Sequence, residues 1–327
     1  MQIPRRLAAP SDRTVNRLIV GSILVLVIGI PLIGVLYFFD QYRSPGPSLV
    51  DRDIQAAEQA VTENPNLLTA RLALAQAYAK NGRFADAIAQ YDQILNASPD
   101  AGTALLGRGT AAIALDRLEA AKVDFQRVVD LAESGEMANV DPQLESAYYS
   151  LGVIALKKGQ PQDAVVQLAN AIQIKRTDAD ALNLLGTALL QAGEPQRAVT
   201  ATRQAIALVP IGWCDPYVQL ETAYTSLNDT TGAQYAAGMV ALCQNRPEDA
   251  QAKLAPLTSG AYAVDALVGL GLLAEFQNDT TAAVDAYSKV LQKDPQNFAA
   301  TTGLGRIGGI PSGSPAASPS AGPTGGG

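Results

Sequence analysis

The chain contains no histidine, only two cysteines, three methionines and one tryptophan. Without histidine there can be no Ser-His-Asp triad, no Cys-His dyad and no zinc site with histidine ligands. Cys214 and Cys243 are too few to build a cysteine-only zinc site. These absences exclude the common zinc centres and the His-dependent nucleophilic mechanisms, and we expect neither a metal nor a cofactor.

Positive charge is also scarce. The net charge is −7, and no long run of Lys or Arg occurs. Because binding DNA or RNA requires clustered basic side chains that neutralise phosphates, we predict no nucleic-acid partner. Hydrophobic residues make up 48% of the chain, with many Ala and Leu, which is typical of packed helices rather than of a disordered chain.

One apolar run is long enough to cross a membrane. Residues 18–39 read LIVGSILVLVIGIPLIGVLYFF and carry no charge. As a helix the run would measure roughly 33 Å, close to the ~30 Å hydrocarbon core of a bilayer. The alternative is a cleaved signal peptide, whose apolar region is usually shorter and ends in small residues rather than in Tyr-Phe-Phe-Asp. We expect an uncleaved transmembrane helix in contact with the lipid bilayer.

The charges beside this run predict its orientation. Four arginines precede it, Arg5, Arg6, Arg13 and Arg17, whereas Arg43 and Arg52 follow it among three aspartates. Cytoplasmic flanks carry the excess of Lys and Arg. We therefore expect a single-pass protein with a cytoplasmic tail (residues 1–17) and an extracytoplasmic C-terminal domain, periplasmic or extracellular.

After a linker, residues 40–50, the chain repeats itself with a period of about 34 residues. One repeat, LLTARLALAQAYAKNGRFADAIAQYDQILNASPD, begins at Leu67, and related segments begin at Ala179 and Val264. Each has an apolar helix, a short polar break, a second helix centred on Ala and usually a closing Pro. Such a period predicts stacked helical hairpins that bury their faces against one another.

Two positions of the repeat hold small residues, and this pattern resembles the tetratricopeptide repeat. The first position holds Ala75, Gly109, Gly152, Gly186 and Gly271, and the second holds Ala87, Ala121, Ala164, Ala198, Ala233 and Ala283. The closing prolines are Pro99, Pro210, Pro295 and a displaced Pro142. The resemblance covers most of residues 51–310 and implies an all-α fold, a right-handed helical solenoid of the tetratricopeptide type preceded by one transmembrane helix.

Several segments depart from the pattern. The ends read as single helices, residues 51–64 and 297–307, and about ten extra residues follow Leu131. Glu221 replaces a small residue, and residues 246–263 do not complete a repeat, so we expect a bend or break near residue 250. Residues 311–327 contain no charge, aromatic ring or large apolar side chain, which predicts a disordered tail.

The resemblance places Cys214 at the start of a first helix and Cys243 near the end of its second helix. Because the two helices run antiparallel, these ends are neighbours, and we predict a disulfide. The loop-entropy model gives it ~3–4 kcal/mol of stabilisation. A disulfide would agree with an oxidising, extracytoplasmic compartment. Two buried free thiols are the alternative.

The resemblance also implies a binding surface, since first helices in this family line a concave groove for extended peptides or partner helices. Carried onto this sequence, the groove positions are Leu72, Gln76, Leu106, Thr110, Tyr149, Val153, Leu156, Asn183, Thr187, Leu190, Val218, Thr222, Thr225, Val268 and Leu272. The alternative is that several of them only pack neighbouring helices.

These features predict a membrane-anchored scaffold or assembly factor that binds other proteins, membrane-bound or secreted. A permanent structural subunit of a larger membrane complex would have the same sequence features. An enzyme or small-ligand receptor would have to use carboxylates such as Asp180, Asp215 and Asp265. Those lie near helix starts, where carboxylates stabilise the helix dipole, so we expect no enzyme.

Overall fold

The computed structural model describes residues 21, 26–35, 37, 49–209 and 211–308, and every regular element among them is helical. The chain divides into two units, residues 1–70 and 71–327, each described here by itself. The predicted tails, residues 1–17 and 311–327, lie outside the described residues, as does Pro210.

In the first unit, residues 26–35 form a helix whose apolar side chains are exposed, with Ile33 68% exposed. The other residues of the predicted span 18–39, apart from Gly21 and Tyr37, lie outside the described residues. Within the described part of the chain, no helix combines the length and the hydropathy that crossing a membrane requires.

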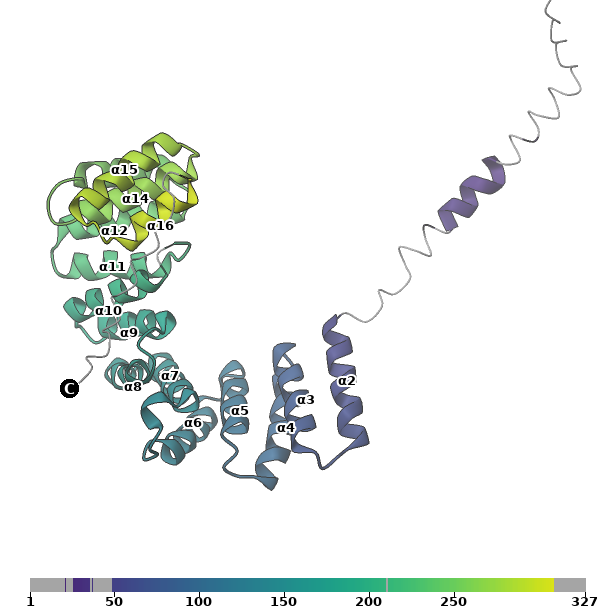
Figure 1. Ribbon diagram of the computed structural model, residues 1–327. Helices are drawn as coiled ribbons and strands as arrows, with labels where there is room; N and C mark the ends of the chain where they lie inside the picture. The colour runs from purple at the N-terminus through teal and green to yellow at the C-terminus, as the bar shows by residue number, and fades with distance from the viewer. Residues whose placement is uncertain (1–20, 22–25, 36, 38–48, 210, 309–327) are drawn as a thin grey trace, which may run out of the picture. The chain divides into compact units, whose positions relative to one another are not determined.

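Helix α2 (Leu49–Glu63) begins earlier than predicted (Figure 1). Leu49 and Val50, assigned to the linker from the sequence, are its first residues, so the predicted boundary at residue 50 was wrong. The physical reason is that Pro47 is the last helix-breaking residue of the linker, and neither Leu nor Val prevents a helix from starting directly after it.

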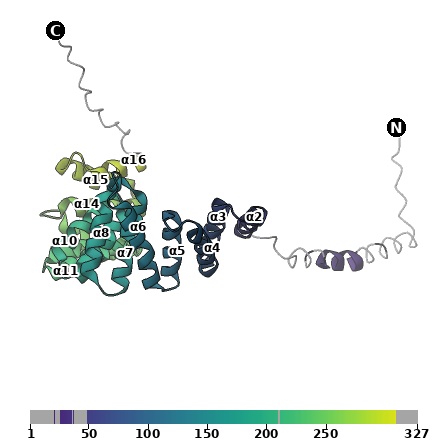
Figure 2. The same ribbon diagram turned by 90° about the horizontal axis from the view of Figure 1, so that it is seen from below.

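The second unit is a succession of antiparallel helix pairs (Figures 1 and 2). Its helices are α3 (Leu68–Lys80, which begins in the first unit), α4 (Phe84–Ala97), α5 (Gly102–Ala114), α6 (Leu118–Ala132), α7 (Pro142–Lys157), α8 (Pro161–Ile174), α9 (Ala179–Gln191), α10 (Pro195–Leu208), α11 (Asp215–Ser226), α12 (Thr230–Cys243), α13 (Pro247–Leu254), α14 (Ala263–Phe276), α15 (Thr280–Lys293) and α16 (Phe298–Arg306). Short 3₁₀ turns cover Ala138–Val140 and Ala255–Leu257.

The small residues of the repeat lie where the two helices of a pair cross. A Cβ atom at Gly109 would lie 2.7 Å from Cζ of Phe125, and one at Gly152 would lie 2.6 Å from Cγ of Leu168. Gly at this position therefore lets the second helix place a large side chain directly against the first helix. The alanines predicted for the second helix are completely buried, except Ala233, which is half-buried.

The turn inside each pair requires a backbone conformation that few residues adopt. The turn residues have φ between 57° and 78°: Gly82, Asp116, Gly159, Gly193, Asn228 and Asn278. Gly, Asn and Asp tolerate this left-handed region best. The short polar breaks seen in the sequence are thus the residues that reverse the chain between the two helices.

Pro142 begins a helix rather than closing one, so the prediction for this proline was wrong. It is the first residue of α7, and the carboxylate of Asp141 accepts hydrogen bonds from the backbone N–H groups of Gln143 (2.7 Å) and Leu144 (3.3 Å). Pro is favoured at this first position because its missing N–H would have no partner there. The extra residues after Leu131 therefore end in a capped helix start.

The segment 246–263 forms one short helix instead of a pair, as the sequence predicts. Helix α13 packs against α12 on one side and α14 on the other. Its Leu254 is completely buried, and Cβ atoms at Gly238 of α12 and Gly269 of α14 would lie 2.7 and 2.9 Å from this side chain. The single helix interrupts the alternation of first and second helices.

Candidate functional site

The first helices α5, α7, α9 and α11 form a continuous row, because each contacts the next one. None of the predicted groove residues is buried. Five of them are exposed: Gln76, Thr110, Val218, Thr222 and Thr225. The other ten are half-buried, and Tyr149, Leu156 and Leu190 among them also pack against the core. The side chains of this row, from Leu106 on α5 to Thr225 on α11, are called the first-helix row below.

Four predicted groove residues do not belong to this row. Leu72 and Gln76 lie on α3, which precedes it. Val268 and Leu272 lie on α14, beyond the single helix α13. Val268 lines a cavity of about 300 Å³ together with Arg203, Asp265 and Phe298. Leu272 lines a different cavity of about 450 Å³. The sequence assigned them to the same groove because the repeat register continues. Helix α13 lies between α12 and α14 in the chain, yet Tyr217 of α11 lines both cavities.

Hydrogen-bond acceptors dominate the polar part of the first-helix row. The hydroxyls of Thr110, Thr187, Thr222 and Thr225 each donate to a backbone carbonyl four residues earlier on their own helix, at 2.7 to 3.4 Å. Their oxygen lone pairs stay available. The side-chain oxygen of Asn183 is buried and accepts no hydrogen bond from the described residues. The row therefore offers acceptors to a molecule that carries N–H groups.

Negative charge gathers where α7 meets α9. Burial, and then Asp180, Asp178 and Glu145 in that order, raise the pKa of Tyr149 above its ordinary value. Burial, followed by repulsion from Asp178, also raises the pKa of the Glu145 carboxyl. Lys175 offsets part of this charge through an ion pair with Asp178 at 2.8 Å. The centre of the first-helix row is acidic.

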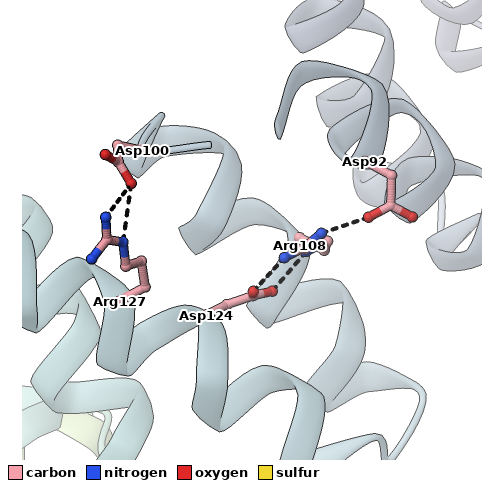
Figure 3. Close-up of polar contacts among 5 residues, drawn as sticks. All are labelled: Asp92, Asp100, Arg108, Asp124 and Arg127. Atoms are coloured by element: carbon pink, nitrogen blue, oxygen red, sulfur yellow. Dashed lines mark hydrogen bonds and ion pairs between the residues drawn. The ribbon is translucent and has the colours of Figure 1, made fainter. Parts of the chain in front are cut away.

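An arginine that the sequence analysis missed ties the start of the row together. Arg108 of α5 donates to Asp92 of α4 and to Asp124 of α6, and Arg127 of α6 pairs with Asp100 in the turn before α5 (Figure 3). Arg108 lies sixteen residues from each of its two carboxylates. This equal spacing of Asp92 and Asp124 on either side of Arg108 is the signal in the sequence that could have revealed the two ion pairs.

The structure places the two cysteines side by side. Cys214 directly precedes α11 and Cys243 ends α12, and both are half-buried free thiols that line the cavity of about 450 Å³ with Leu272 and Phe276. Burial, together with a hydrogen bond to Cys214, raises the pKa of the Cys243 thiol to about 12. Their proximity permits a disulfide, which stays a prediction.

The carboxylates considered for an enzyme do not converge. Asp180 lies in the first turn of α9, and Asp215 is the first residue of α11. Asp265 accepts two hydrogen bonds from Arg203, at 3.0 and 3.1 Å, so an ion pair as well as the helix dipole accounts for it. The described residues contain no group of three or more side chains suited to holding a metal ion.

The repeat register, the small crossing residues and the turn geometry can now be compared with known proteins. A family model described as tetratricopeptide repeat matches residues 72–136, 149–210 and 235–298, together more than half of the chain. The chain belongs to the tetratricopeptide-repeat family. Members of this family mediate protein–protein interactions on the extended surfaces of their stacked helices. No curated protein matches the chain in sequence.

Several solved structures are similar to this chain. BtubC from P. vanneervenii is 15% identical, with a TM-score of 0.50 over 60% of this chain and 88% of BtubC. YrrB, described as a TPR protein with an unusual peptide-binding site, is 17% identical, with a TM-score of 0.42 over 76% of this chain and 97% of YrrB. MamA is 22% identical, with a TM-score of 0.44 over 59% of this chain and 97% of MamA. At these identities the likeness concerns the fold alone.

Proposed function

We propose that this protein is a membrane-anchored scaffold or assembly factor without enzymatic activity. It holds an extended segment or a helix of a partner protein, membrane-bound or secreted, on the first-helix row outside the cytoplasm. One observation carries the proposal. The half-exposed side chains of α5, α7, α9 and α11 form one surface, and the Asn183 amide oxygen in that surface is buried without a donor.

The energetics of Asn183 favour a bound partner. A buried carbonyl oxygen that accepts no hydrogen bond costs about 1–3 kcal/mol. This oxygen is covered in the free protein, so an N–H group of a partner would recover the cost once the Asn183 side chain turns toward the surface, and the threonine hydroxyls of the row would accept further hydrogen bonds. A peptide backbone supplies N–H groups at regular intervals, so it suits the first-helix row.

The charge of the row favours a basic segment. Glu145, Asp178 and Asp180 surround Tyr149, and Lys175 pairs with only one of the three carboxylates. A Lys or Arg of the partner placed near Tyr149 would be attracted by these carboxylates, of which Asp180 is exposed. We therefore expect the partner segment to carry net positive charge.

The membrane anchor is proposed for residues 18–39. Residues 26–35 are helical and expose a succession of large apolar side chains, which a lipid environment would cover. The arginines before this segment favour a cytoplasmic N-terminus. An anchor would also raise the effective concentration of the array for partners in the same membrane.

The test is crosslinking in cells, followed by purification through the C-terminal residues and mass spectrometry. We expect a reproducible set of membrane or secreted proteins, lost in Tyr149→Ala and Asn183→Ala. The matched control is Gln196→Ala, an exposed position on the second helix α10, which should retain every partner. Partners that persist in both groove variants would refute the first-helix row as the binding surface. Exclusively cytoplasmic partners would refute the orientation.

A further inference from the structure

The outer face of α16 is unusual for the last described helix of a solenoid. Ala300, Gly303 and Leu304 are buried against α14 and α15, beside which α16 lies in both views (Figures 1 and 2). The opposite face presents Phe298, which is 70% exposed and also borders the cavity of about 300 Å³, and it carries exposed Thr301 and Gly305. Terminal helices of solenoids usually carry a polar outer face that keeps the array soluble.

Gly305 lies on the same outer face, and no described residue covers it. Pro295 precedes Gly305 by the interval that separates Pro99 from Gly109, so Gly305 stands at the crossing position of the repeat. Gly109 is covered by the ring of Phe125 and Gly271 by the ring of Tyr287, whereas a Cβ atom at Gly305 would meet no atom of the described residues within 4 Å. An aromatic ring over a helix glycine is the packing that this chain uses internally, and at Gly305 it is not present.

Phe298 and Gly305 complement each other across two copies of the chain. They are seven residues apart, which places them on one face of α16 and separates them by about 10.5 Å along the axis. If two α16 helices lie antiparallel around a two-fold axis at Thr301 and Thr302, Phe298 of each copy covers Gly305 of the other. In such an isologous contact, the Phe298 ring of one copy packs against Gly305 of the other copy twice, once on each side of the axis.

We propose that the outer face of α16, formed by Phe298, Thr301, Thr302 and Gly305, is a self-association surface for a second copy of this chain. Charge does not oppose the contact, because Arg306 donates two hydrogen bonds to Glu275 of α14, at 2.7 and 3.0 Å, and is held on its own chain. Helices of nine residues bury less area than the ~1,200 Å² of a stable standard interface, so the dimer is weak and reversible.

The test is disulfide trapping in the purified full-length protein kept in detergent. Thr301 is exposed beside the proposed axis, so the thiol introduced by Thr301→Cys should link two chains under mild oxidation. Mass spectrometry of the linked peptides identifies which residues joined. Two controls are needed. Thr281→Cys, at an exposed threonine of α15, measures linking by random collision, and the unmodified chain measures linking through the native cysteines.

Second substitutions show whether the proposed contacts hold the dimer. Adding Phe298→Ala or Gly305→Leu should lower the linked fraction by about ten-fold or more, because each removes two contacts per dimer. Adding Val123→Ala, which removes a 69% exposed side chain from α6, should leave it unchanged. Circular dichroism confirms that each variant is folded. A linked yield no higher than that of Thr281→Cys, a yield unchanged by both α16 substitutions, or a link to Cys214 or Cys243 instead of the second residue 301 would overturn the proposal.

Discussion

The guanidinium of Arg108 donates two hydrogen bonds to the carboxylate of Asp124, at 2.6 and 2.9 Å, and a third to Asp92 at 2.7 Å (Figure 3). The Asp124 side chain is only 4% exposed. The hydrogen bond to Asp124, outweighing partial burial, raises the pKa of Arg108 above its ordinary value. One side chain thus joins three consecutive helices, α4, α5 and α6.

We expect Arg108→Met to destabilise the array by about 3 kcal/mol or more, because it leaves Asp124 buried without a counter-charge. The control is Arg127→Met, which removes an exposed ion pair with Asp100 and should cost about 0–1 kcal/mol. Thermal unfolding and hydrogen exchange of the α5 and α6 amides measure both. Equal losses of stability in the two variants would show that the burial of Asp124 does not determine the free-energy cost of removing Arg108.

Two glycines at the same repeat position should respond oppositely to alanine. Gly109→Ala places a Cβ atom against the completely buried ring of Phe125, and we expect a loss of about 1–3 kcal/mol. Gly305→Ala meets no atom and should be neutral or stabilising by up to about 1 kcal/mol, since alanine favours helix over glycine. Urea unfolding of both variants tests this, and a destabilised Gly305→Ala would contradict it.

The disulfide prediction concerns the protein isolated from native membranes without reductant. We expect its mass to be lower by two hydrogens than that of the reduced chain, with Cys214 and Cys243 in one linked peptide pair. An oxidant of the disulfide-exchange class must accept the two electrons and two protons. Complete alkylation of both thiols before any reduction would rule the disulfide out.

The reduced form should show a pH dependence set by Cys243. Its folded-state pKa is raised to about 12, whereas the unfolded thiol keeps an ordinary value of about 8.5. The fold favours the neutral thiol, so this contribution to stability is complete below about pH 8.5 and is lost as the pH rises toward 12. Alkylation of the folded, reduced protein at pH 8 should be much slower at Cys243 than in urea. Equal rates in the two conditions would contradict the shift.

Asn183→Leu should separate stability from binding. Leucine removes an amide oxygen that is buried without a donor, so we expect the free protein to gain stability by up to about 1–2 kcal/mol. The same change removes an acceptor from the first-helix row and should weaken partner capture. Thermal unfolding and pull-down of the partners found by crosslinking measure the two effects. A variant that loses stability and keeps its partners would refute both.

Local sequence signals predicted the repeat well. Gly109 and Gly152 revealed the helix crossings because only small residues fit there, and the predicted terminal helix 297–307 differs from α16 by one residue at each end. Pro142 was misread because proline both follows helices and begins them. Which of these two roles Pro142 takes depends on the cap that Asp141 makes at the start of α7.

Contacts between distant residues were harder to predict. Arg108 meets Asp92 and Asp124 only after two turns have set three helices side by side, and neither carboxylate is its neighbour in sequence. The predicted groove extended onto α14 because the register continues in the sequence. The packing of Leu254 between α12 and α14 follows only from three-dimensional contacts.

On the proposed function, the row of contacting first helices sets the length of the partner segment that the protein binds. The uninterrupted row consists of α5, α7, α9 and α11, with neighbouring helices spaced by roughly 10 Å. Three such intervals measure about 30 Å, and an extended chain covers that distance in about nine residues at ~3.3 Å per residue. A short linear sequence is enough to span the first-helix row, so unrelated proteins that share only such a sequence could compete for it.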